Sequence, residues 1–330
     1  MNRQGFKKKR KKKSKFKKVT FLIFVLFLGL SGYIYYQYSQ GIQQASGKST
    51  VSSDATAKTE FNGADTEKVD KINILLLGVD SRGEEQSRTD TIMIAQYDPE
   101  NQKAKLVSLM RDIYVEIPDK KSYKINTAYF LGGPELLRKT IKQNFDIDIH
   151  YYAVIDFKGF ESVVDTLAPN GIEMDVEKRM SENIGVVLQP GLQNLNGKQL
   201  LGYARFRHDA TGDFGRVERQ QRVINVLKDE AISINGVSKL PKLVGTIQPY
   251  IETNLEGFDL LAVVKDFFLN PPDDIETLTI PVDQSYTMES YEHAGSVLEI
   301  DFEENKQAIE QFLNENTVIS QNASSGLQEE

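Results

Sequence analysis

A short loop between two apolar segments, residues 72–77 and 92–95, combines acidic and basic side chains at high density. It reads GVDSRGEEQSRTDT and contains Asp80, Arg82, Arg88 and Asp90. Such a loop is either a solvent-exposed turn with weak ion pairs or part of a site for a divalent cation and a polyanion. If the flanking strands lie side by side, the two aspartates meet at one sheet edge, where with phosphate oxygens and water they can bind Mg²⁺.

More arginines follow in three later segments, SLMRD, YARFRHD and GDFGRVERQQR, which contain Arg111, Arg205, Arg207 and Arg216. The guanidinium group keeps its charge and donates paired hydrogen bonds, so it suits phosphate. Each segment lies at the expected end of a strand or start of a helix, where α/β folds bind ligands. A single helical arginine is more often solvent-exposed, so the inference depends on all of them together.

Local spacing predicts how these side chains are grouped. If 205–207 is extended, Arg205 and Arg207 share one face. On the following helix Arg216 and Gln220 are four residues apart and therefore lie one above the other. Asp213 is a candidate cap for the N-terminus of that helix, where backbone N–H groups favour an anion.

Several other kinds of site are excluded by composition. The chain has no cysteine, so disulfides, thiolate zinc sites and a cysteine nucleophile are impossible. The three histidines, His150, His208 and His293, lack metal-ligand spacing, and no nucleophile-elbow serine motif occurs. The glycine-rich phosphate loops of nucleotide-binding proteins are also missing from the sequence.

The order of strand and helix patterns predicts an α/β fold, with a mixed central β-sheet covered by helices on both faces (α-β-α). Short apolar runs bounded by turns predict strands at 72–80, 91–98, 103–110, 151–157 and 171–176. Apolar residues at helical spacing predict helices at 134–145, 160–167, 215–232 and 257–270.

The N-terminal region predicts a membrane anchor. Residues 1–18 contain eleven Lys or Arg and no acid, although the whole chain has a net charge of −7. Residues 19–38 carry no charge over about the 20 residues that a transmembrane helix needs. Basic residues on one side only predict a single-pass protein of the cell membrane with a cytoplasmic N-terminus and an extracellular domain. The apolar run is longer than that of a cleaved signal peptide.

The remaining chain divides by composition. Small and polar residues predict a flexible stalk over 39–70, and a similar composition predicts a disordered tail over 314–330. Residues 71–313 form the predicted extracytoplasmic domain. The basic tail is better explained by orientation in the membrane and contact with anionic lipid than by nucleic acid binding.

Together these segments resemble the LytR-CpsA-Psr family of membrane-anchored bacterial cell-wall transferases. The resemblance extends over residues 72–231 and rests on GVDSR with RTDT, SLMRDIYVEIP, KINTAYFLGGPE, YYAVIDFKGFESVVD and LNGKQLLGYARFRHDATGDFGRVERQQRV. It implies transfer of a glycopolymer from a polyprenyl-pyrophosphate carrier to peptidoglycan through a phosphodiester, with release of polyprenyl phosphate. Teichoic acid and capsule would both fit as the polymer.

The resemblance also implies roles for individual residues. It makes Asp80 and Asp90 ligands of Mg²⁺, with Mn²⁺ as an alternative. It assigns pyrophosphate binding to Arg111, Arg205, Arg207, Arg216 and Gln220, supported by Arg82 and Arg88. The base for the acceptor hydroxyl stays open among Asp90, Asp112 and Asp213. An apolar slot for the polyprenyl tail could be lined by Leu136, Leu137, Ile141, Phe145, Phe160, Val163 and Val164, which could equally be core residues.

Two other functions remain compatible with the same arginines. One is a non-catalytic regulator of envelope assembly that binds polyprenyl-linked ligands, and the other is a hydrolase with water as acceptor. A transcription factor is disfavoured because no helix-turn-helix is legible and the basic segment adjoins the predicted membrane span.

Overall fold

The structure is a computed structural model that describes residues 32–33, 35–43, 60–66, 71–80, 89–233, 241–242, 244–246, 250–255, 267 and 270–314. Most of the predicted membrane anchor and of the predicted helix 257–270 therefore lies outside the described residues, as do Arg82 and Arg88. Among the described residues, no helix has the length and apolar character needed to cross a bilayer.

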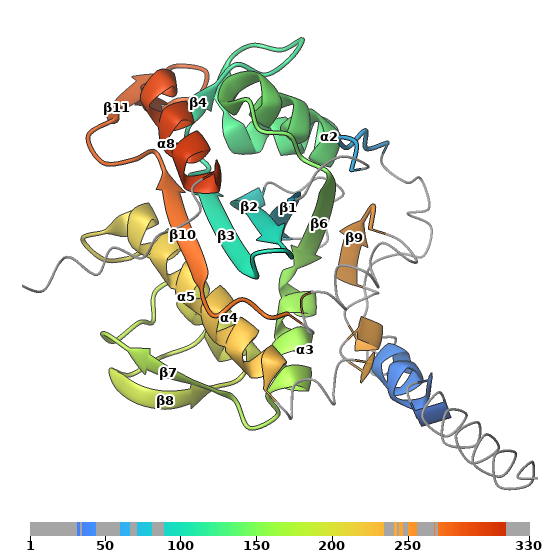
Figure 1. Ribbon diagram of the computed structural model, residues 1–330. Helices are drawn as coiled ribbons and strands as arrows, with labels where there is room; N and C mark the ends of the chain where they lie inside the picture. Colours follow the sequence, from blue (N-terminus) through green and yellow to red (C-terminus); the bar gives the residue numbers. More distant parts are fainter. Residues whose placement is uncertain are drawn as a thin grey trace, which may run out of the picture.

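A six-stranded mixed sheet forms the centre of the domain, in the order β10-β3-β2-β1-β6-β9 (Figure 1). Strand β1 runs antiparallel to β2 and parallel to β6, while β3 runs antiparallel to β2 and parallel to β10. The bounds are Ile72–Val79 for β1, Thr89–Asp98 for β2, Lys103–Leu109 for β3, Tyr151–Asp156 for β6, Ile251–Thr253 for β9 and Ile275–Ile280 for β10. The predicted mixed central sheet is confirmed.

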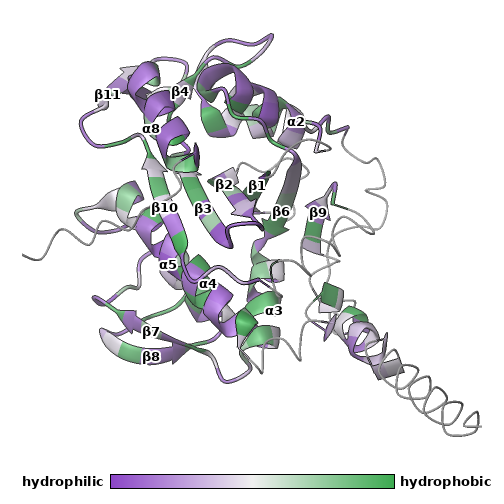
Figure 2. Cartoon of the chain, viewed as in Figure 1, coloured by the Kyte–Doolittle hydropathy of each residue, from purple (hydrophilic) through white to green (hydrophobic). Residues whose placement is uncertain are grey.

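Helices pack on both faces of this sheet. Val107 and Leu109 of β3 belong to the main apolar core together with Leu137 and Ile309 from two helices. Ser108, between them, points to the opposite face, where a glutamine of a third helix donates to its hydroxyl over 3.0 Å. The helices are α2 Ile125–Phe145, α3 Phe157–Leu167, α4 Gly197–Arg205, α5 Gly212–Ile232 and α8 Phe302–Asn314. Figure 2 shows hydrophobic residues along the central strands and mixed colouring on the helices around them.

Helix α2 begins earlier than the sequence indicates. The predicted start at Pro134 corresponds only to its second half, because the helix begins at Ile125 and has a kink at two glycines. Gly133 has φ 64°, a conformation that favours glycine. Pro134 follows it in the first turn of the second half, where a missing N–H costs nothing. The backbone is thus non-helical at Gly132 and Gly133, and the second helical half begins at Pro134, where the sequence predicts a helix start.

The predicted fifth strand at 171–176 forms, but outside the central sheet. It is β7 (Ile172–Val176), which pairs with β8 (Gly191–Leu195) in a separate two-stranded sheet. Alternation of buried and exposed residues identifies a strand but not its partner. Two further small sheets are β4 (Tyr114–Val115) with β5 (Tyr123–Lys124) and β11 (Tyr286–Tyr291) with β12 (Gly295–Ile300).

The residues named for an apolar lipid slot pack largely in two cores. Leu137, Ile141 and Phe145 belong to the main core, and Val164 belongs to a second core between α3, α4, α5 and the β7-β8 sheet. Leu136 and Phe160 are partly buried against these clusters. Their burial is explained by packing alone, so the lipid slot remains an expectation.

Part of the segment predicted as a stalk contacts the domain. The N–H of Ala64 donates to the carbonyl of Ile149 over 2.9 Å, and the ring of Phe61 lies 4.7 Å from that of Tyr152. Phe61 is the one large aromatic residue between 39 and 70, and its packing buries apolar area. Contacts with the domain therefore begin before residue 71.

Candidate functional site

A cavity of about 560 Å³ lies at the sheet edge where β1 and β3 end and β2 begins. All the described residues predicted to bind the metal ion or the pyrophosphate line it: Asp80, Asp90, Arg111, Arg205, Arg207, Arg216 and Gln220. They come from segments up to 140 positions apart, since Asp80 and Gln220 are at the extremes. The remaining two predicted residues, Arg82 and Arg88, lie outside the described part of the chain. The candidate bases Asp112 and Asp213 do not line the cavity but contact Arg111.

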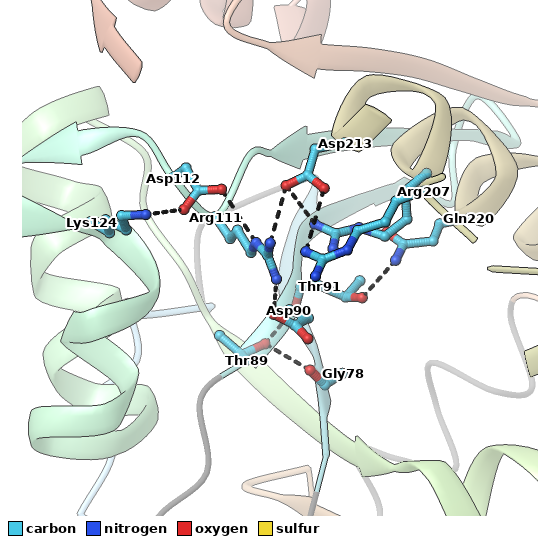
Figure 3. Close-up of polar contacts among 11 residues, drawn as sticks. Gly78, Thr89, Asp90, Thr91, Arg111, Asp112, Lys124, Arg207, Asp213 and Gln220 are labelled. Carbon is cyan, nitrogen blue, oxygen red and sulfur yellow. Dashed lines mark hydrogen bonds and ion pairs between the residues drawn. The ribbon is translucent and has the colours of Figure 1, made fainter. Parts of the chain in front are cut away.

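The pairing of β1 with β2 places both aspartates at this cavity. Gly78 lies opposite Thr91 and Val79 opposite Thr89, with an irregularity in register between these pairs. The buried hydroxyl of Thr89 lies 2.9 Å from the carbonyl of Gly78 and 2.7 Å from that of Thr91 (Figure 3). A polar residue buried at a strand end thus fixes the backbone on either side of Asp90.

Arg111 is the centre of the ionic contacts (Figure 3). Its Nη1 lies 2.5 Å from Asp90, its Nη2 3.3 Å from Asp213 and its Nε 3.3 Å from Asp112. Burial alone would lower the pKa of Arg111, but the charges of Asp90 and Asp213 outweigh burial and raise it. Lys124 binds the other oxygen of Asp112 over 2.7 Å and so orients the carboxylate behind Arg111.

Arg216 is in a different electrostatic position. It is 5% exposed, and within the described part of the chain its one ion pair is a 3.4 Å contact with Asp213, a carboxylate that also contacts Arg111. Its buried Nε has no hydrogen-bond partner among the described residues, which is also true of the Nε of Arg219. Burial and the positive charge of Arg111 lower the pKa of Arg216, and Asp213 offsets this only in part. The positive charge of Arg216 is therefore only partly compensated, and a bound anion would stabilise it.

Arg205 and Arg207 reach the same cavity by a route that the sequence did not predict. The expected extended segment at 205–207 is wrong, because Arg205 is the last residue of helix α4 and the extended backbone begins at Phe206. The guanidinium of Arg205 lies 4.3 Å from the ring centre of Phe157, a cation–π contact. Nη1 of Arg207 lies 4.0 Å from Asp213. The helix end, not strand alternation, directs both side chains to the cavity.

The loop after Arg207 is held by a buried ion pair. Nη2 of Arg219 lies 3.0 Å from Asp209 and donates to the carbonyl of Phe206 over 3.1 Å. Asp209 also accepts from the N–H of Gly212 over 3.0 Å. These contacts fix both ends of the segment between α4 and α5, and so the direction of Arg207.

The predicted cap at Asp213 is wrong. The N-cap of α5 is Thr211, whose side chain makes no capping bond. Asp213 lies in the first turn, and its carboxylate bridges arginines of the cavity. Charge compensation among arginines outweighs one capping hydrogen bond here.

Gln220 lies one turn after Arg216, as its spacing predicts. Its Nε2 donates to the hydroxyl of Thr91 over 3.0 Å (Figure 3). This contact joins α5 to the start of β2 beside Asp90. It also makes Thr91 a cavity residue that no sequence pattern indicated.

The rim of the cavity contains polar residues that no sequence pattern indicated. Glu182, Asn183 and His208 line it. A nitrogen of His208 lies 3.2 Å from Glu182, and Nε2 lies 2.7 Å from the side-chain nitrogen of Asn183. His208 follows Arg207 directly, which was a possible signal, but nothing local indicates that 182–183 lies opposite.

A divalent cation fits the donor set only with help from a ligand. Asp80 and Asp90 both line the cavity, and Asp90 is shared with Arg111. In the described ranges, no group of three or more His, Cys, Asp or Glu could hold a metal ion. Two carboxylates suit Mg²⁺, which usually binds one or two carboxylates plus phosphate oxygens and water.

Known proteins similar to this chain show its family and support its fold. The model of the LytR_cpsA_psr family matches residues 35–312. A Staphylococcus aureus (strain COL) protein described as "Regulatory protein MsrR" is 47% identical over 283 residues, covering 86% of this chain and 85% of the relative.

A second relative is described by its reaction. "Polyisoprenyl-teichoic acid--peptidoglycan teichoic acid transferase TagU" from Bacillus mycoides (strain KBAB4) is 34% identical over 229 residues, covering 68% of this chain and 74% of the relative. The solved structure "TagT bound to LI-WTA" has a TM-score of 0.60 and 26% identity, covering 77% of this chain and 95% of that one. This chain belongs to the LytR_cpsA_psr family.

Proposed function

We propose that this protein transfers an anionic glycopolymer from a polyprenyl-pyrophosphate carrier to a hydroxyl of peptidoglycan and releases polyprenyl phosphate. The observation that carries the proposal is the convergence of four arginines, from the end of β3, α4, α5 and the segment between these two helices, on one cavity with two aspartates. The relative TagU, described as a teichoic acid transferase, supports the same reaction class.

The charge of the cavity matches a pyrophosphate diester. Such a ligand carries two negative charges, and arginines offer donors in the planar geometry that phosphate accepts. Arg216 is the side chain most in need of an anion, because it is 5% exposed and shares its carboxylate with Arg111. Arg205 and Arg207, at the more exposed side, would bind oxygens nearer the glycopolymer.

The reaction forms one phosphorus–oxygen bond and breaks another. The acceptor hydroxyl attacks the phosphorus that bears the glycopolymer, and the bridging oxygen leaves with polyprenyl phosphate. Negative charge grows on that leaving oxygen, where Arg111 and Arg216 would stabilise it. Donors that are already positioned cost no rearrangement in the transition state.

The hydroxyl proton requires a carboxylate as acceptor. Asp112 is the weakest candidate of the three, because Lys124 and Arg111 outweigh its burial and lower its pKa. Its role is to orient Arg111. Asp90 and Asp213 remain as proton acceptors, and both lie within 3.3 Å of Arg111.

We further propose that Asp80 and Asp90 hold Mg²⁺, or Mn²⁺ in its place, when substrate is bound. Such an ion would supply additional positive charge to the phosphate oxygens. We also propose that the chain is anchored in the cell membrane by residues 19–38, which would bring the domain to a lipid-linked substrate.

The test is a transfer assay with a lipid-linked glycan donor and purified peptidoglycan, using the full-length protein in detergent. Asp90→Ala should lower the rate by at least about 100-fold, as expected for loss of a group that stabilises charge in the transition state. Arg179→Ala, at an exposed residue outside the cavity, is the control. Full activity of Asp90→Ala would refute the site.

A second candidate function is regulation by binding without turnover. It is favoured by the description of the 47% identical relative as a regulatory protein. The same arginines would bind the pyrophosphate, so product formation decides between the two. Polyprenyl phosphate released only when peptidoglycan is added supports transfer, release without peptidoglycan indicates hydrolysis, and binding with no release supports regulation.

A further inference from the structure

A second cavity, of about 640 Å³, contains aromatic and polar side chains outside the proposed active site. Tyr114, Ser122, Gln143 and His293 are among the residues that line it. We call it the tyrosine–histidine groove. It is formed by the β4-β5 ribbon, the loop between these two strands, the end of α2 and the turn after β11.

The exposed ring of His293 lies among three tyrosines. Its centre is 6.2 Å from Tyr114, 5.6 Å from Tyr123 and 5.8 Å from Tyr291, and Tyr114 stacks on Tyr291 at 4.8 Å. Its Nε2 lies 3.3 Å from the hydroxyl of Tyr114 and 3.2 Å from the carbonyl of Ser122. The hydroxyl of Tyr123 donates to the carbonyl of His293. The aromatic platform is therefore held in place before any ligand binds.

The charges in the groove are balanced, unlike those at the arginine cavity. Two exposed lysines, Lys120 and Lys121, are matched by two exposed acids, Glu116 and Asp119. A polyanion gains little from such a surface, whereas an uncharged polar ligand can use both donors and acceptors.

The groove begins close to the reacting groups. Tyr114 is three residues after Arg111, so their Cα atoms are at most about 11 Å apart even in a fully extended chain. Tyr114 also pairs in register with Lys124, whose ammonium holds Asp112 against Arg111. A chain molecule seated in the groove could therefore extend to the arginine cavity.

This combination of groups suits a saccharide. Sugar rings have C–H faces that pack on aromatic rings, and hydroxyl and acetamido groups that pair with side chains such as Gln143 and Glu116. We propose that the tyrosine–histidine groove binds the sugar backbone of the acceptor glycan strand of peptidoglycan. The proposal rests on the transfer function above and adds a site for the acceptor, separate from the arginines that bind the donor.

The direct test measures binding of purified glycan strands, free of attached polymer, to full-length protein in detergent by cosedimentation. His293→Ala should weaken binding by about five- to tenfold, the effect of losing one aromatic contact. Met288→Ala is the matched control, because Met288 is 71% exposed on neighbouring β11 and does not line the groove. Unchanged binding by His293→Ala would overturn the proposal.

Transfer kinetics add an independent readout. His293→Ala should raise KM for the glycan acceptor by the same factor, with kcat at saturating acceptor and KM for the lipid-linked donor unchanged. Lys121→Gln should change both binding and KM less than twofold if the ligand is uncharged. A large loss in Lys121→Gln with a raised donor KM would show that the anionic polymer occupies the groove, and would overturn the assignment.

The two proposals fail separately. The cosedimentation assay requires no turnover, so loss of binding in His293→Ala without any transfer by the wild type supports the groove and refutes the transferase. Transfer by the wild type with equal glycan binding by His293→Ala refutes the groove alone.

Discussion

Two arginines of helix α5, three residues apart, are equally buried but differ in their surroundings. Arg216 is 5% exposed and Arg219 is 3% exposed. Arg219 lies 3.0 Å from Asp209 and 3.5 Å from Glu177, and it also donates to a backbone carbonyl. Arg216 has one carboxylate at 3.4 Å, which it shares with Arg111.

The comparison separates structural from ligand-binding arginines by charge balance. Arg219 contacts two acids, Asp209 and Glu177, although each of them also contacts a second basic residue, Lys178 or Arg222. Its positive charge is therefore better compensated than that of Arg216, and it stabilises the fold without a ligand. Arg216 is crowded by Arg111 and Arg207, which together with burial lower its pKa. Burial and residue type are the same in both, so neither identifies the binding residue.

The largest predicted effect is on stability. Arg219→Met should lower the free energy of unfolding by about 3–5 kcal/mol, because Asp209 and the carbonyl of Phe206 both lose a buried charged donor, although Lys178 still contacts Asp209. Urea unfolding of the detergent-solubilised protein at pH 7 measures this. Arg222→Met, on the same helix but with a side chain 51% exposed, should change stability by less than about 1 kcal/mol. If Arg219→Met lowered stability by less than about 1 kcal/mol, Arg219 would not be a structural arginine, and the distinction from Arg216 would fail.

Arg216→Met should have the reverse pattern. We expect the transfer rate to fall by about 100- to 1,000-fold, equivalent to about 3–4 kcal/mol of transition-state stabilisation. The free energy of unfolding should change by less than about 1 kcal/mol, because the variant loses the contact with Asp213 but also removes the repulsion of Arg216 by Arg111 and Arg207. Rate and urea unfolding are measured on the same preparation. A variant that unfolds easily but still transfers polymer would make Arg216 structural.

The stability from Asp209 should depend on pH. Burial would raise its pKa, but hydrogen bonds from Thr211 and Lys178 and the charge of Arg219 outweigh burial and lower it to about 2. A lowered pKa gives stability that is present above about pH 4 and lost as pH falls towards 2. Asp209→Asn should therefore cost about 2 kcal/mol at pH 7 and almost nothing near pH 2.

Unfolding of the wild type and Asp209→Asn is compared at several pH values between 7 and 2. A constant difference across this range would show that Asp209 acts through neutral hydrogen bonds alone.

The smallest predicted effect concerns Gln220. Gln220→Ala removes one neutral hydrogen bond to Thr91 and should lower kcat/KM for the donor by about five- to tenfold, or about 1 kcal/mol. Steady-state kinetics with varied donor measure it. A loss as large as that of Arg216→Met would mean that Gln220 contributes more than a neutral contact.

Much of the fold follows from local patterns. The strands at 72–79, 89–98, 103–109 and 151–156 form where apolar runs predict them, and the helices at 157–167 and 212–232 do likewise. The two edge strands, β9 and β10, were not predicted, because short amphipathic segments give a weak periodic signal. The start of α2 was missed because its first half, INTAYFL, precedes the Gly-Gly kink.

The sequence predicted which residues belong to the site better than it predicted how their side chains are arranged. Residue type and position along the chain singled out the two aspartates and the arginines that now line one cavity. The bridging role of Asp213 and the support from Lys124 were not predictable, since each depends on a partner far away in the sequence.

The amino-acid sequence by itself determined which charges the protein has and, for Asp80, Asp90 and Arg216, at which strand end or helix start they lie, because periodicity and turn residues act over a few positions. Arg205, at the end of a helix, is an exception. The tertiary structure alone decided how these charges are paired. Asp90 meets Arg111 and Asp209 meets Arg219 through strand register and helix packing. Because Coulomb energy depends on distance in space, only the folded chain separates the balanced Arg219 from the unbalanced Arg216.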